Sequence, residues 1–134
     1  MTIENFRDLL AQAQAKGPQG VVAVGAQQTS TLEALAAAQA KGLARPILVG
    51  DEQEIRDNAL RLSLDLADMQ IVHEPDINQA ARRAMQLVAD GKAKVAMKGQ
   101  IDTATFLRAA LDRAFGLRTS TLLSHVAAFD MKSL

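Results

Sequence analysis

The sequence predicts an α/β fold in which a mostly parallel sheet is flanked by helices. The first observation is that short β-branched runs alternate with longer segments of helical period, a pattern typical of parallel sheets. The second is that three helical segments open on pairs with the spacing of a capping box, namely Ser30 with Glu33, Asp51 with Glu54, and Asp76 with Gln79. The third is the length of 134 residues, which suits one domain with a hydrophobic core. We therefore expect residues 1–134 to form a single α/β domain.

The expected elements alternate along the chain. A helix over residues 3–16 comes first, and later helices begin near the three capping pairs and just before Phe106. The expected strands are Val21–Val24, Pro46–Val49, Met69–Val72, Lys94–Met97 and Thr121–Phe129. Only Asp130–Leu134 follow the last strand, with no covering helix or pairing strand. Either this strand lies at a sheet edge, or the chain continues in the parent protein.

The composition excludes several classes of function. There is no Cys, so thiol nucleophiles, disulfides and thiolate metal sites are ruled out. The 15 basic residues balance the 15 acidic ones, and aromatic residues are only 3% of the chain, which argues against nucleic-acid binding. Charged residues near the start and the lack of a long apolar run argue against export and membrane insertion. We expect a cytoplasmic protein with a small-molecule partner.

The segment after the fourth expected strand carries the strongest chemical signal. Ligands of parallel α/β sheets collect at the carboxyl ends of the strands. Lys98 ends a strand, Gly99 allows a close backbone approach, and Asp102, Thr103 and Thr105 open a helix that carries Arg108 one turn later. Free amides at a helix start, together with a lysine, favour a phosphate site. The alternative is that Asp102 and Thr103 only cap the helix while Lys98 is solvated, and spacing leaves both readings open.

The remaining polar residues give weaker signals. Arg118, beside Thr119, offers a planar fork for two phosphate oxygens, although a lone arginine in a loop is more often a surface residue. Ser124 and His125 are adjacent in an expected strand, so their side chains point to opposite faces and a direct catalytic dyad is disfavoured. His73 is expected to be a surface or cap residue. No metal-ligand spacing, dinucleotide fingerprint or P-loop is present, and we expect neither a metal nor a tightly bound cofactor.

The order and spacing of three segments are distinctive. They are Met97–Arg108 (MKGQIDTATFLR), Gly116–Thr119 (GLRT) and Ser124–Ala127 (SHVA). Together with Ile47–Asp51 and Leu87–Ala93 upstream, they resemble the phosphate acetyl/butyryltransferase family, nearest its phosphate butyryltransferase branch. The resemblance covers essentially the whole chain.

The resemblance implies a phosphate acyltransferase, with acyl-CoA and phosphate on one side of the reaction and acyl phosphate and coenzyme A on the other. Coenzyme A is then a substrate, and the acyl group is butyryl or a similar short chain. The resemblance also implies a two-domain subunit of the isocitrate/isopropylmalate dehydrogenase-like type, with this chain as its amino-terminal half, assembled as a homodimer or larger oligomer. A non-catalytic α/β module that binds coenzyme A or a phosphorylated ligand is the alternative.

The same resemblance suggests roles for individual residues. It implies catalytic positions at Lys98, Arg118, Ser124 and His125. Substrate or phosphate contacts are implied at Gly99, Asp102, Thr103, Thr105, Arg108 and Thr119. A base for the coenzyme A thiol is not identifiable in this sequence.

Overall fold

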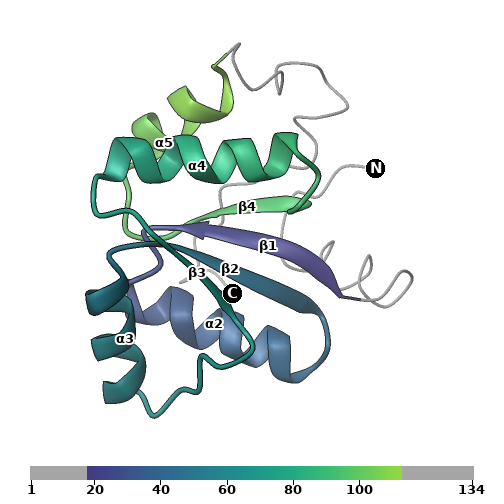
Figure 1. The fold of residues 1–134 in the computed structure, drawn as a ribbon, viewed down its shortest axis with the longest axis vertical. Helices are drawn as coiled ribbons and strands as arrows, with labels where there is room; N and C mark the ends of the chain where they lie inside the picture. The colour runs from purple at the N-terminus through teal and green to yellow at the C-terminus, as the bar shows by residue number, and fades with distance from the viewer. Residues whose placement is uncertain (1–17, 113–134) are drawn as a thin grey trace.

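A computed structural model of the chain describes residues 18–112, which form a parallel sheet covered by helices on both faces (Figure 1). The strands are β1 (Gln19–Val24), β2 (Ala44–Gly50), β3 (Gln70–His73) and β4 (Val95–Lys98). Each bound lies within two residues of the expected one, so these four strands are confirmed. The expected helix over residues 3–16 and the expected strand Thr121–Phe129 lie outside the described residues.

Four helices connect and cover the described strands. They are α2 (Thr29–Ala40), α3 (Glu52–Arg61), α4 (Ile77–Ala89) and α5 (Thr103–Ala110). Figure 1 shows α2 and α3 below the sheet and α4 and α5 above it. Side chains alternate between the faces of a strand, so Val21 and Ala23 pack with α2 and α3, whereas Val22 and Val24 pack with α4 and α5.

The strand order creates a switch point beside β1. The sheet runs β3-β2-β1-β4, and all neighbouring pairs are parallel. The chain moves outward from β1 to β3, then returns through α4 to place β4 on the other side of β1. Val24 at the end of β1 is therefore paired with Val49 of β2 and with Lys98 of β4. The loops after β1 and β4 lead to helices on opposite faces, which is where ligands bind in open α/β sheets.

The helix caps follow the sequence expectation at two of three positions. Asp51 accepts a hydrogen bond from the Glu54 N–H, and Asp76 accepts from the N–H groups of Asn78 and Gln79. Ser30 as a cap was wrong, because Gln28 is the N-cap and α2 begins at Thr29. The Gln28 side chain instead accepts from the Thr31 hydroxyl at 2.8 Å.

His73 is a cap residue, as expected, but for a different helix from the one that follows it. It ends β3, and its Nδ1 accepts from the Glu52 N–H of α3 at 3.1 Å. The ring thus satisfies one of the backbone donors that every helix start leaves unpaired. The arrangement ties the start of α3 to the neighbouring strand.

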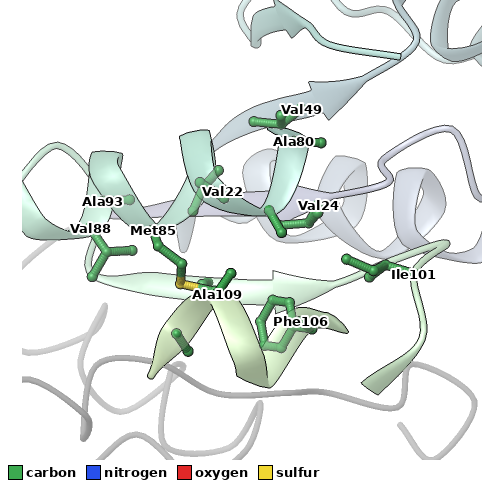
Figure 2. Packing of buried hydrophobic residues seen from close by; sticks show 14 of the residues in the cluster. Val22, Val24, Val49, Ala80, Met85, Val88, Ala93, Ile101, Phe106 and Ala109 are labelled. Atoms are coloured by element: carbon green, nitrogen blue, oxygen red, sulfur yellow. The ribbon is translucent and has the colours of Figure 1, made fainter. Parts of the chain in front are cut away.

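Phe106 anchors α5 to the sheet. Its side chain is fully buried in a cluster with Val24, Met85 and Ile101, and Figure 2 shows these side chains filling the layer between α4, α5 and the strands. The neighbouring residue Leu107 is 42% exposed. Since α5 has only eight residues, its position depends on this packing.

We expect Phe106→Ala to lower the free energy of unfolding by about 3 to 5 kcal/mol, because it leaves a cavity under α5. Leu107→Ala is the matched control on the same helix and should change it by less than about 1 kcal/mol. Urea unfolding of both variants measures the difference, and equal losses would contradict this account of how α5 is anchored.

Candidate functional site

Lys98 stands at the switch point between β1 and β4. It is the last residue of β4, it is half-buried, and it shares its face of the sheet with Ala96, on the side of α4 and α5. The ion pairs found within residues 18–112 involve Arg56, Arg82 and Arg83, and none includes Lys98. Its ammonium is therefore available to bind an anion at the carboxyl end of the sheet.

Asp102 caps α5 through two hydrogen bonds from one residue. Its carboxylate accepts from the Thr105 N–H at 2.9 Å and from the Thr105 hydroxyl at 2.7 Å. These two bonds, the side-chain one first, hold the pKa of Asp102 below its ordinary value of 3.8. The carboxylate is thus ionised at neutral pH, and the capping reading of Asp102 is confirmed.

The cap leaves part of the helix start open. Both donors of Thr105 are used by Asp102, so Thr105 offers no donor to a ligand in this arrangement. No described residue accepts from the N–H groups of Thr103 and Ala104. The negative charge of Asp102 opposes binding of a second anion there. An anion site at the start of α5 therefore depends on nearby cations as well as on the free amides.

Arg108 contributes a cation from the last turn of α5. With Thr105 it lines a hollow of about 110 Å³ between α4 and α5, which is smaller than a typical site for a whole cofactor. The opposite wall of the hollow contains Asn78 and Arg82 of α4. Arg82 pairs with Asp112 at 2.6 Å, so one carboxylate also faces this space.

Sequence reasoning missed Asn78 and Arg82, because they belong to a helix that is distant in the chain. Their spacing of four residues places both on one face of α4, and this was the available signal. Which neighbour that face meets depends on the packing of α4 against α5.

Gly99 lies against the loop that follows β1. A Cβ at this position would lie 2.5 Å from the Gly25 carbonyl oxygen, so the close approach is to the loop after β1. Its N–H donates to the Val24 carbonyl at 2.8 Å. Gly99 therefore serves a contact between two loops.

The structure brings together only some of the site residues that the sequence analysis expected. Asp102, Thr103, Thr105 and Arg108 lie in or beside the first two turns of α5, and Lys98 and Gly99 directly precede them. Arg118, Thr119, Ser124 and His125 lie outside the described residues.

Two wider hollows lie elsewhere. Each has a volume of about 470 Å³. One adjoins α3 and β3 and includes Glu52, Arg56 and Asp65, whereas the other includes Gly20, Arg45 and Lys92 near the amino ends of the strands. Neither includes Lys98 or a residue of the loops at the switch point, so the carboxyl ends of β1 and β4 remain the candidate site.

Within the described residues, no cluster of three or more His, Asp or Glu side chains is arranged to hold a metal ion. None of the helices described here has the length and apolar character needed to cross a membrane.

Comparison with known sequences identifies consistent relatives. A profile of the family described as "Phosphate acetyl/butaryl transferase" matches residues 5–80. The chain is 42% identical over 128 residues to the phosphate butyryltransferase of Clostridium acetobutylicum, a match that spans 96% of this chain and 42% of that protein. It is also 42% identical over 129 residues to the Clostridium beijerinckii phosphate butyryltransferase, of which it covers 43%. The chain thus spans less than half the length of these relatives.

Solved structures show the same fold. A phosphotransacetylase from Streptococcus pyogenes matches with a TM-score of 0.65 and 20% identity, over 79% of this chain and 40% of that one. A branched-chain phosphotransacylase from Enterococcus faecalis V583 matches with a TM-score of 0.57 and 27% identity, over 69% of this chain and 33% of that one.

The Asp102 cap gives a prediction about pH. Since its pKa is lowered in the folded protein, the unfolded chain binds more protons in acid, and the stabilisation by ionised Asp102 is lost as the pH falls below its ordinary value. We expect the unsubstituted protein to be more stable than Asp102→Asn at neutral pH.

That advantage should shrink as the pH falls from about 5 towards about 2, the range in which a carboxylate with a lowered pKa takes up its proton. Urea unfolding of both proteins across this range measures it. A stability difference that stays constant from neutral to acid pH would contradict the role of the ionised carboxylate.

Proposed function

Because the chain belongs to the phosphate acetyl/butyryltransferase family, we propose that the protein transfers a short acyl group between coenzyme A and phosphate. The reaction converts acyl-CoA and inorganic phosphate into acyl phosphate and coenzyme A, and it is reversible. Butyryl is the proposed acyl group, since the relatives with 42% identity are phosphate butyryltransferases. The structural observation that carries the proposal is that Lys98 ends β4 at the switch point, in the segment that leads directly into α5.

The proposed chemistry needs groups that stabilise negative charge. When the coenzyme A thiolate attacks an acyl phosphate, charge grows on the carbonyl oxygen and on the departing phosphate. Preorganised donors are worth roughly 3 to 4 kcal/mol each in such sites. We assign Lys98 and the amides of Thr103 and Ala104 to the phosphate, with Arg108 alongside.

Thr105 and Asp102 then act on the site indirectly, because their mutual hydrogen bonds hold the first turn of α5 in place. Gly99 acts indirectly through its contact with the Gly25 loop. Arg118 and Thr119 are proposed as further phosphate ligands, and Ser124 and His125 as residues that line the cleft.

The proposal extends to the organisation of the whole protein. We take residues 1–134 as one α/β domain, the amino-terminal half of a two-domain subunit of the isocitrate/isopropylmalate dehydrogenase-like type. This agrees with the share of the relatives that the chain covers, about 42%. The site then lies in a cleft between domains. We further propose a cytoplasmic homodimer or larger assembly that holds coenzyme A as a substrate and has no tightly bound cofactor.

The first test is phosphate-dependent release of coenzyme A by the intact protein. With butyryl-CoA we expect free thiol to appear only when phosphate is added, with acyl phosphate formed in equal amount. A series of acyl-CoA chain lengths then defines the acyl preference. Thermal stabilisation by butyryl-CoA without turnover would instead support a non-catalytic binding module.

The second test compares two lysines of one strand segment. We expect Lys98→Met to lower kcat/KM for phosphate by about 100-fold, because it removes a charged donor from the site. Lys94→Met is the control, since Lys94 is exposed and directly precedes β4, at its opposite end. Its effect should stay within about twofold, as for a neutral surface change. Steady-state kinetics with varied phosphate measures both, and equal losses would remove Lys98 from the site.

A further inference from the structure

We infer that Gly25 is a positioning residue for the phosphate site, because its missing side chain lets the loop after β4 cross directly over the end of β1. This inference rests on the proposed function and deepens it. Gly25 itself is assigned no contact with the substrate.

The crossing has no room for a side chain at residue 25. A Cβ there would lie 2.5 Å from the carbonyl oxygen of Gln100 and 2.8 Å from its backbone nitrogen. Both are backbone atoms, so they cannot rotate away as the end of a side chain can. Gly25 also has a φ of +72°, in the left-handed region that disfavours L side chains.

Gly99 completes the crossing from the other side. A Cβ on Gly99 would lie 2.5 Å from the Gly25 carbonyl oxygen and 2.8 Å from that of Val24. The open side of Gly25 thus faces Gln100, and the open side of Gly99 faces Val24 and Gly25. A side chain on either one would separate the loops.

Backbone hydrogen bonds hold the crossing in a fixed geometry. The Gly99 N–H donates to the Val24 carbonyl, and the Gln100 N–H donates to the Gly25 carbonyl, each at 2.8 Å. On the far side, the Gly25 N–H donates to Val49 of β2 at 2.8 Å. The loop after β4 is therefore tied through Gly25 to the middle of the sheet.

The crossing lies between the groups assigned to phosphate. Lys98 is two residues before Gln100, and the α5 cap Asp102 is two residues after it. A side chain at residue 25 must displace Gln100, and that displacement moves the Lys98 backbone and the first turn of α5 relative to each other. Misplacing a catalytic constellation by about 1 Å can cost roughly 100-fold in rate.

Another glycine provides a control matched for backbone conformation. Gly42 also has a φ of +72°, but nothing lies within 4 Å of a Cβ built on it. Gly42→Ala therefore introduces the same backbone strain as Gly25→Ala without the collision. A difference between the two variants reports the crossing rather than the strain.

A second pair of glycines, Gly20 and Gly99, tests whether the place of a backbone collision matters. A Cβ on Gly20 would lie 2.7 Å from the Lys92 carbonyl oxygen, near the amino end of β1 and just before β4. Gly20→Ala and Gly99→Ala thus both force apart the chain around β1 and β4, but at opposite ends of these strands. Neither glycine has a positive φ. This pair covers the case in which Gly25→Ala does not fold.

The experiment measures phosphate kinetics of the four variants in the intact protein, at a temperature where circular dichroism shows each to be folded. We expect kcat/KM for phosphate to fall by about 10- to 100-fold in Gly25→Ala and Gly99→Ala. Gly42→Ala and Gly20→Ala should stay within about twofold of the unsubstituted protein. The KM for acyl-CoA should change little in all four, since the displaced groups are those assigned to phosphate.

Amide hydrogen exchange supplies a readout that does not depend on activity. The Gly99 and Gln100 amides should exchange faster in Gly25→Ala than in Gly42→Ala, because their acceptors lie at the crossing. The positioning role would be overturned if the unsubstituted protein is active but Gly25→Ala changes kcat/KM for phosphate no more than Gly42→Ala, and Gly99→Ala no more than Gly20→Ala. An unsubstituted protein that releases no coenzyme A on addition of phosphate would instead contradict the proposed function.

Discussion

The burial of β1 between two parallel neighbours is the constraint on which the other features depend. All six residues of β1 are buried, and its side chains enter the hydrophobic clusters on both faces of the sheet. Both faces must therefore be covered, as parallel sheets require. With α2 and α3 on one face and α4 and α5 on the other, the loops after β1 and β4 lead in opposite directions. The position of the candidate site is thus a consequence of how β1 is buried.

The local charge at the carboxyl ends of β1 and β4 depends on which charged side chains are already in ion pairs. The whole chain has no formal net charge. Asp112 is paired with Arg82, whereas the ammonium of Lys98 has no ion-pair partner among residues 18–112. Asp102 is hydrogen-bonded to the uncharged Thr105 and keeps its negative charge, which the cations of Lys98 and Arg108 outnumber. A balanced composition thus still leaves local positive charge. Composition predicts the absence of long-range attraction to a polyanion, and it does not predict a local anion site.

The sequence predicted features that depend on neighbouring residues and missed those that depend on tertiary contacts. Asp51, Asp76 and Asp102 cap helices through bonds that span two or three residues, so spacing was enough to find them. Gln28 was missed because the turn before α2 is set by bonds from Gly25 and Ala26 to Val49 of the next strand. The role of Gly99 depends in the same way on Gly25, which is 74 residues earlier in the sequence.

The described residues contain the groups that we assign to phosphate, but no evident base for the thiol of coenzyme A in the proposed reaction. The carboxylate of Asp102 accepts two hydrogen bonds from Thr105 that lower its pKa, so it is a poor proton acceptor. The carboxylate of Asp112 is paired with Arg82. His73 ends β3, which is three strand spacings from β4, or roughly 14 Å at about 4.8 Å per spacing. That distance exceeds the reach of direct proton transfer to a ligand beside Lys98. We therefore propose that the base lies outside residues 18–112, and that this region contributes to the proposed reaction by holding phosphate and the reacting groups in a fixed geometry.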